Sequence, residues 1–400
     1  MVVMLKIVAS AVLWGGLLTS FAATPLVASA GEAFTIGLDA DMSSASAESG
    51  ESIRRGMVVA IDEINAAGGV LGKPLQLKVR DHRGNPARGI DNIDVFGAQD
   101  DIIAVMGGLH TPVTMAELPS IHRNNLIYLV PWAAGTKIID NGHIPNNVFR
   151  VSVRDEYAGR FLAQEAQRRG FKTIGLLMEQ TGWGRSNETT FQNVAREIGL
   201  KISGVQWFSW GVKDLRLQIE SLRSSGAEVI LLVANAREGT VAASAVASMT
   251  EQQRLPIISH WGITGGKFAE MLGDDIEAID LTFLQTYSFL HPTRPERANA
   301  FLTRYYALFP QDRPMPQDIR SPVGAAHAYD LTHMLARAIA QAGSVEPDKL
   351  RHALENLGRF EGLVKVYDPP FTSSRHDALT QDDFTLARFL RGGAIIPEKR

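Results

Sequence analysis

A helical spacing of apolar residues in the first hundred positions gives way to a strand-like spacing. Over 51–66 apolar side chains recur every three or four positions, which predicts a helix with one buried face. Two glycines at 68–69 favour the end of this helix, and the apolar–polar alternation over 75–80 predicts a strand. The helix face that we expect in the core consists of Ile53, Met57, Ala60, Ile61 and Ile64.

Short apolar runs alternate with helical patterns along most of the chain. Strands this short, apolar and separated by helices are typical of parallel sheets covered on both faces. We expect strands at 34–39, 75–80, 102–106, 126–130, 172–178, 201–208, 228–233 and 256–259. We expect helices at about 51–66, 112–123, 156–169, 186–198, 213–225 and 238–252.

The pattern pauses near residue 151 and then starts a second strand–helix series. Two similar series in a chain of 400 residues predict an α/β protein with two doubly wound parallel-sheet lobes. Beyond residue 282 we expect mainly two long helices, at about 296–309 and 323–341, and then irregular chain to Arg400.

The first 30 residues resemble an export signal rather than part of the fold. Lys6 precedes an apolar segment at 7–18 that is too short to span a membrane comfortably, and an A-x-A cleavage site follows at 28–30. We predict a signal peptide at 1–30, a mature chain that begins near Gly31 and a periplasmic location. An uncleaved anchor is the alternative. The chain has no Cys, which excludes a lipidated N-terminus, disulfides and thiol catalysis.

Composition and motifs argue against several classes of function. Hydrophobic residues make up 45% and charged residues 21%, and the net charge of −3 offers no basic excess for nucleic acid. The sequence has no G-x-S-x-G elbow, no P-loop and no G-x-G-x-x-G after a strand. Its histidines are scattered without metal-ligand spacing. We therefore expect no catalytic residue, no metal and no cofactor.

The segment GGLHTPVTMAELP at 107–119 follows the predicted strand IIAVM and carries candidate binding chemistry. Thr111 suits the N-cap of the next helix, and Pro112 suits its first position. A helix start beyond the carboxyl end of a strand leaves N–H groups unpaired, which makes it a seat for a carboxylate. The alternative is that Thr111 only caps the helix, although one hydroxyl can do both.

The strand, helix, Asn-Ala-Ala-Gly-Gly turn and strand up to residue 81 resemble the first unit of type I periplasmic solute-binding proteins. The closest resemblance is to the leucine/isoleucine/valine-binding family of ABC importers. It extends over residues 33–395 and includes a late helix at 325–343. It implies a monomer that captures a small molecule and delivers it to ABC permease subunits in the membrane.

The resemblance also implies that the chain crosses between the lobes three times, near 151, 283 and 361. The first lobe would then comprise 31–151 and 284–361, and the second lobe 152–283 and 362–400.

Implied ligand contacts in the first lobe lie in three turns. Thr111 falls on the family serine that holds the ligand carboxylate. In VPWAAGTK, Ala133 falls on a contact position, and either Gly135 or Thr136 falls on a contacting threonine. Ser49 is a further candidate, in a loop that covers the ligand in the family but is small and polar here.

Implied contacts in the second lobe point to a ligand class. Trp183 falls on a tyrosine that stacks on the ligand, and Ala236 falls on another contact position. Trp261 falls where amino-acid binders have a Glu that pairs with the ligand ammonium. An ammonium in a closed cleft needs an anionic partner, for which an indole is a weak substitute. We therefore expect an aromatic or aliphatic acid rather than a standard amino acid, unless Glu179 or Glu238 compensates.

Four residues beside these turns either contact the ligand or have a structural or solvated role. Trp132 either lines the cleft or packs against the turn, and His110 and His260 either donate to the ligand or are structural. Arg185 is more simply a solvated residue of a first helical turn. Two alternative functions also stay open, a ligand-sensing receptor subunit of amide or amino-acid type and an α/β enzyme.

Overall fold

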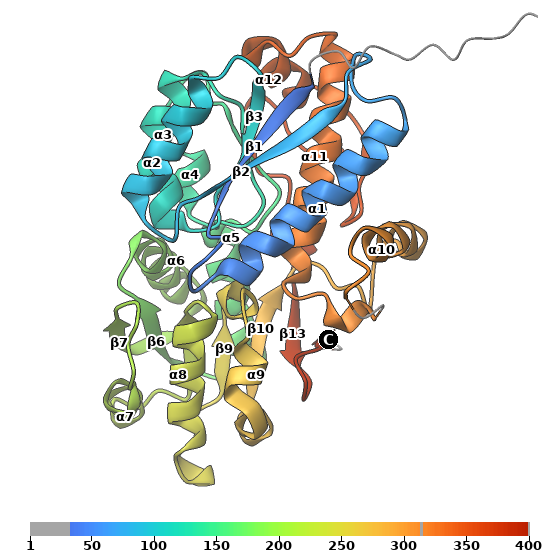
Figure 1. The fold of residues 1–400 in the computed structure, drawn as a ribbon. Helices are drawn as coiled ribbons and strands as arrows, with labels where there is room; N and C mark the ends of the chain where they lie inside the picture. Colours follow the sequence, from blue (N-terminus) through green and yellow to red (C-terminus); the bar gives the residue numbers. More distant parts are fainter. Residues whose placement is uncertain (1–32, 313–314, 399–400) are drawn as a thin grey trace, which may run out of the picture. The chain divides into compact units, whose positions relative to one another are not determined.

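The computed structural model describes residues 33–312 and 315–398, so the predicted signal peptide and its cleavage site lie outside the described residues. The fold is α/β, with parallel sheets in two lobes, as the sequence predicts (Figure 1). Between these limits, no helix has both the length and the apolar character that a membrane span requires.

Five parallel strands form the sheet of the first lobe. The apolar runs that predict β1 and β3 are buried almost throughout, because helices cover both faces of the sheet. Across the sheet the strands are β2 (Leu75–Asp81), β1 (Phe34–Ala40), β3 (Ile102–Met106), β4 (Tyr128–Val130) and β5 (Val148–Arg150).

Helices α1 (Ala47–Ala66) and α11 (Pro322–Ala342) lie side by side on one face of this sheet (Figure 1). The five predicted core residues of α1 are all buried. The helix ends before Gly68 and Gly69, whose φ angles of 104° and 75° interrupt it as predicted.

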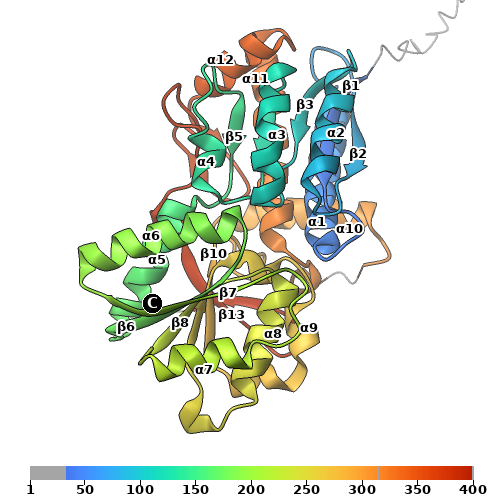
Figure 2. The same ribbon diagram turned by 90° about the vertical axis from the view of Figure 1, so that its left-hand side faces the viewer.

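The opposite face carries α2 (Pro86–Gly97) and α3 (Thr111–Arg123), as Figure 2 shows. The sequence interpretation did not include α2. Its start is fixed by Asn85, whose side chain accepts from the Ala87 N–H at 2.9 Å. Three more helices pack against those of the first sheet: α4 (Thr136–Ile139) against α3, α10 (Pro295–Leu308) against α1, and α12 (Pro347–Glu355) against α11.

Seven strands form the sheet of the second lobe, and all pairings are parallel except β14–β13 and β13–β10. Across the sheet the strands are β14 (Ile395–Pro397), β13 (Thr385–Phe389), β10 (Leu281–Gln285), β9 (Ile257–Ser259), β8 (Val229–Val233), β6 (Thr173–Glu179) and β7 (Lys201–Phe208). The helices that cover it are α5 (Asp155–Arg168), α6 (Gly182–Ile198), α7 (Arg216–Ser224), α8 (Ala236–Ala247) and α9 (Phe268–Leu272).

The prediction of irregular chain after the second long helix is wrong. That region holds α12, a two-stranded ribbon of β11 (Phe360–Glu361) and β12 (Val366–Tyr367), and the antiparallel strands β13 and β14. These strands are short, and β13 pairs with a strand about a hundred residues earlier in the chain. Local periodicity carries little information about such a pairing.

Within the described residues the first sheet holds no strand after β5, whereas β6 to β10 and then β13 and β14 belong to the second sheet; between β10 and β13 the chain packs α11 against α1 of the first lobe. The residue limits of the two lobes remain a prediction.

Candidate ligand-binding cleft

The predicted carboxylate seat lies at the start of α3. His110, not Thr111, occupies the N-cap position, so the predicted N-cap is wrong by one residue. The His110 carbonyl accepts from the Thr114 N–H at 3.0 Å, which makes Thr111 the first helical residue. Thr111 Oγ1 accepts from the Gly135 N–H at 3.3 Å. Within the described part of the chain its own O–H has no acceptor, so it is free to donate to a ligand.

The turn after β4 lies against this seat. The Ala133 N–H donates to the Gly108 carbonyl at 2.6 Å. Gly135 contacts Thr111, whereas Thr136 begins α4 and its N–H reaches Ser186 Oγ of the second lobe at 3.4 Å. The two candidates for the contacting threonine therefore face different partners, Gly135 facing Thr111 of the first lobe and Thr136 facing Ser186 of the second.

Two indole rings meet between the lobes. Trp132 stacks on Trp261 with ring centroids 5.1 Å apart, and the two residues are 4% and 1% exposed. Gly265 of the second lobe and Gly324 of α11 leave room for the Trp132 ring, since a Cβ at either position would lie 3.3 Å from it. Trp132 therefore lines the boundary between the lobes rather than the interior of one lobe.

Trp183 is buried in a polar network in the second lobe. Asp155 Oδ1 accepts from Trp183 Nε1 at 3.0 Å and from Asn187 Nδ2 at 2.8 Å, and it lies 3.3 Å from His260 Nε2. His260 Nδ1 accepts from the Trp261 N–H, so the protonated Nε2 faces Asp155. Asp155 Oδ2 and Asn187 Oδ1 are buried and have no partner among the described residues.

Asp155 is the residue that sequence reasoning missed. It is the first residue of α5, where an acid is an ordinary helix-start residue, so its position alone did not indicate a site. The only available signal was its place just after the pause near residue 151. A buried carboxylate oxygen without a partner is costly, which points to a hydrogen-bond donor or a cation on a ligand.

Glu179 and Glu238, the two candidates for an ammonium partner, are both occupied. Glu179 accepts from Thr181 Oγ1, from Trp210 Nε1 at 3.0 Å and from Asn235 Nδ2 at 3.0 Å. Burial raises the pKa of Glu179 to about 7. Glu238 Oε1 accepts from the Gly211 N–H.

His110 and Arg185 differ in their relation to the cleft. The His110 ring lies 5.4 Å from the Trp210 ring of the second lobe and 3.6 Å from an Asp41 carboxylate oxygen, so it joins the lobes beside the seat. Arg185 is exposed, pairs with Glu188 and covers the Trp207 ring. This geometry agrees with the interpretation of Arg185 as a solvated residue of a first helical turn.

Ser49 lies at a second contact between the lobes, and Ala236 lies beside Gly266 of its own lobe. Ser49 belongs to α1 rather than to the preceding loop, and its Oγ donates to the Gly265 carbonyl. The Ala236 Cβ would lie 3.2 Å from a Cβ at Gly266. The predicted contacts thus fall into three groups. The first, near the predicted seat, consists of Thr111, Ala133, Gly135 and Thr136. The second consists of Trp183 and Trp261, which both contact the His260 ring, and the third of Ser49 and Ala236, which lie near Gly265 and Gly266.

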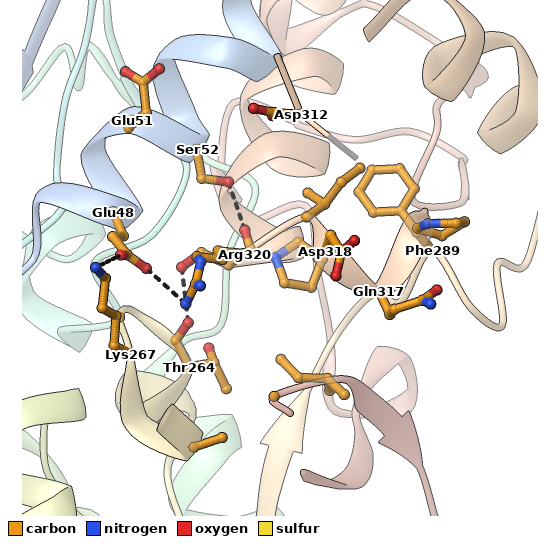
Figure 3. A pocket seen from close by; sticks show the side chains of 18 of the residues that line it. Glu48, Glu51, Ser52, Thr264, Lys267, Phe289, Asp312, Gln317, Asp318 and Arg320 are labelled. Atoms are coloured by element: carbon orange, nitrogen blue, oxygen red, sulfur yellow. Dashed lines mark hydrogen bonds and ion pairs between the residues drawn. The ribbon is translucent and has the colours of Figure 1, made fainter. Parts of the chain in front are cut away.

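A cavity of 740 Å³ opens between α1, the segment at 264–270 and the segment at 316–322, and Figure 3 shows its charged lining. We call it the side cavity. Glu48 pairs with Lys267 at 3.4 Å and with Arg320 at 3.6 Å, and Arg320 also pairs with Glu270. These ion pairs join the lobes beside the Trp132–Trp261 stack. Among the residues that the structure covers, no three His, Asp or Glu side chains group as metal ligands.

The chain is similar in sequence and fold to known binding proteins. A model of the periplasmic binding protein family matches residues 33–394. A Leu/Ile/Val-binding protein homolog of Brucella abortus is 24% identical over 332 residues, which cover 82% of this chain and 84% of that protein.

Two solved structures share the fold over 92% of this chain. One is a branched-chain amino acid transporter substrate-binding protein of Streptococcus pneumoniae in complex with isoleucine, with a TM-score of 0.76, 18% identity and all of that chain covered. The other is an ABC transporter solute-binding protein of Rhodopseudomonas palustris HaA2 in complex with p-hydroxybenzoic acid, with a TM-score of 0.78, 18% identity and 96% of that chain covered. These relatives are solute-binding proteins, which does not favour the enzyme or receptor alternatives. The chain belongs to the periplasmic binding protein family, as a type I substrate-binding protein of an ABC transporter.

Proposed function

We propose that this protein captures a small carboxylate with an aromatic or aliphatic body between its lobes and presents it to an ABC permease. The observation that carries the proposal is the Trp132–Trp261 stack, whose rings, one from each lobe, would form an aromatic wall for the ligand. The free O–H of Thr111 at the start of α3 supports an anion seat nearby. A flat apolar body against the indoles and a carboxylate at Thr111 would use both features.

A standard amino acid is the second candidate, and one specific observation favours it. Asp155 Oδ2 and Asn187 Oδ1 are buried acceptors that have no partner among the described residues, and a ligand ammonium would be a donor for them. Asp155 would then take the role of the family Glu that Trp261 replaces. The isoleucine complex of one structural neighbour and the p-hydroxybenzoic acid complex of another support one candidate each.

Titration of the mature protein separates the two candidates. Phenylacetate, 4-hydroxybenzoate, L-leucine and L-phenylalanine are added in turn while Trp fluorescence is followed, because both cleft indoles should respond to an occupant. The proposal expects micromolar binding of the acids and weak binding of the amino acids. Micromolar binding of the amino acids, with none for the acids, establishes the second candidate instead.

We propose in addition that the lobes close on the ligand by bending at crossings near 151, 283 and 361. A monomer with a closed cleft would then dock on the permease. The location follows from cleavage after Ala30, which the A-x-A site supports. The intact mass of the protein from the periplasmic fraction should correspond to a chain starting at Gly31, and a full-length mass would contradict it.

A further inference from the structure

Arg150, the last residue of β5, joins the carboxylate seat to the C-terminal part of the chain. It is 0% exposed. Its Nη1 donates to the carbonyls of Ala133 and Gly135, at 3.2 Å and 2.9 Å. Its Nε donates to Asp377 Oδ1 at 2.6 Å. One guanidinium therefore holds two carbonyls of the turn that follows β4.

The two bonds to Arg150 orient the N–H groups on the other side of the turn. In a trans peptide the C=O and the following N–H point in opposite directions. Fixing the carbonyls of Ala133 and Gly135 towards Arg150 thus turns the N–H groups of Ala134 and Thr136 away from it. The Thr136 N–H does point away, because it reaches Ser186 of the second lobe.

Asp377 keeps Arg150 in place. A buried guanidinium needs a counter-charge and defined hydrogen bonds. Asp377 is itself buried, and its Oδ2 accepts from Arg154 Nη1 at 3.1 Å, directly before α5. The segment around Asp377 also runs along β5, where the Arg150 N–H donates to the His376 carbonyl and the Ala378 N–H donates to the Arg150 carbonyl. The C-terminal segment therefore helps to hold the turn at 133–136 in place, because Asp377 fixes the Arg150 side chain that bonds to it.

We propose that Arg150 is a positioning residue for anion binding, which holds the turn at 133–136 so that the Ala134 N–H, the one N–H of this turn without an acceptor among the described residues, and the Thr111 hydroxyl face a ligand carboxylate. The inference rests on the proposed function, since it requires that this turn is the seat. It adds a residue whose Nε and Nη1 are held by protein groups while its Nη2 has no partner among the described residues, and it gives the C-terminal segment a role at the site.

A merely structural ion pair would predict a different outcome. Loss of a buried pair lowers the stability of the whole protein whatever else the pair does. A positioning role predicts that Arg150→Met loosens the turn at 133–136 more than the neighbouring strands. It also predicts a larger loss of affinity for a carboxylate than for a neutral analogue.

Arg254 supplies the matched control. Like Arg150 it makes three hydrogen bonds, but all three go to backbone carbonyls, those of Ala247, Met249 and Ala278, in the second lobe and away from the seat. Arg254→Met therefore removes a comparable set of bonds without touching the turn. Should Arg150→Met fold poorly, Arg150→Lys keeps the charge but cannot hold both carbonyls and Asp377 with one planar group.

Hydrogen exchange, which needs no ligand, is the first measurement. In Arg150→Met, or in Arg150→Lys, we expect the amides of 131–140 to exchange about tenfold faster or more, while those of 102–106 keep their protection. Arg254→Met should leave 131–140 unchanged. Uniform acceleration in the Arg150 variants, or none at 131–140, would overturn the proposal even if no ligand were known.

Calorimetry with 4-hydroxybenzoate and the neutral 4-hydroxybenzyl alcohol is the second measurement. If the wild type binds the acid, Arg150→Met should weaken that binding about tenfold or more and should change binding of the alcohol little. An equal loss for both compounds would overturn the positioning role. If the wild type does not bind the acid, the proposed ligand class fails, and hydrogen exchange alone decides on Arg150.

Discussion

Trp132 and Trp261 stack across the boundary between the lobes, with ring centroids 5.1 Å apart and planes inclined by 28°. Each ring comes from a turn that follows a strand of a different sheet, so the wall they form exists only while the lobes lie together. We therefore propose that ligand specificity and lobe closure depend on the same two side chains.

Trp261→Glu should shift the preference from acids towards amino acids. The new carboxylate would supply the partner that a ligand ammonium needs in a closed cleft, while the stacking surface for an aromatic acid is lost. The ratio of the L-leucine and phenylacetate affinities, measured by calorimetry, should rise about tenfold or more, which corresponds to about 1.4 kcal/mol. Trp261→Leu is the control, since it removes the ring without adding a charge. A similar change of the ratio in both variants would mean that the indole, and not the missing carboxylate, sets the preference.

Thr111→Val should weaken binding of an anionic ligand. Hydrogen bonds to charged groups contribute roughly 1.5–3 kcal/mol, so the affinity should fall about tenfold to a hundredfold. Thr114→Val is the matched control, because Thr114 is a buried threonine of the same helix whose hydroxyl donates to the His110 carbonyl. Calorimetry that finds unchanged affinity in a folded Thr111→Val protein would rule out the contact.

Glu179→Gln should reduce the dependence of stability on pH. Burial raises the pKa of Glu179 from 4.5 to about 7, so the folded state holds this proton over a range in which the unfolded state has lost it. The contribution of Glu179 to stability is therefore present below about pH 4.5 and is lost as the pH rises to about 7, with an upper bound of about 3 kcal/mol.

Urea unfolding of the wild type and of Glu179→Gln at pH 5 and pH 8 measures this contribution. The free energy of unfolding should fall more between these values in the wild type, because Gln does not titrate. Gln can still accept from Trp210 Nε1 and Asn235 Nδ2, so the turn should keep its bonds. Identical pH dependence in the two proteins would show that Glu179 does not hold its proton near neutral pH.

Asp39 and Glu117 should share a proton in the core of the first lobe. Burial raises the pKa of both carboxyls. Asp39 Oδ1 accepts from Asn92 Nδ2 and Glu117 Oε2 accepts from the Tyr128 hydroxyl, which leaves Asp39 Oδ2 and Glu117 Oε1 without partners among the described residues. A proton held between these two oxygens satisfies both.

Asp39→Asn tests this pair, because its amide supplies a permanent N–H donor. Since the folded pKa of Asp39 is raised, its contribution to stability is lost as the pH rises towards that pKa. The melting temperature should thus fall less in Asp39→Asn than in the wild type as the pH is raised above 3.8, the ordinary pKa of Asp. Asp39→Ala should cost about 1–3 kcal/mol, because it leaves buried groups unpaired. A parallel fall in Asp39→Asn and the wild type would argue against the shared proton.

Local patterns in the sequence were enough to predict those elements in which the spacing of apolar residues shows which side of the element is buried. The face of α1 from Ile53 to Ile64, the glycines that end it and the buried runs of β1, β3 and β8 could all be predicted, because burial imposes a period on the residues themselves. The order of these elements was enough to indicate two parallel-sheet lobes. The sequence also made Thr111 a candidate, since a helix start beyond a strand carries a recognisable residue pattern, whereas the turn at 133–136 became a candidate only through the family resemblance.

The tertiary structure decided what depends on residues far apart in the chain. Only the fold brings Trp132 to Trp261, Arg150 to Asp377, and Asp155 to Trp183, Asn187 and His260. It also makes β13 and β14 part of the second sheet. The physical reason is the same throughout: a partner, a counter-charge or an unpaired acceptor is a property of pairs of residues, and no spacing within one segment of sequence encodes it.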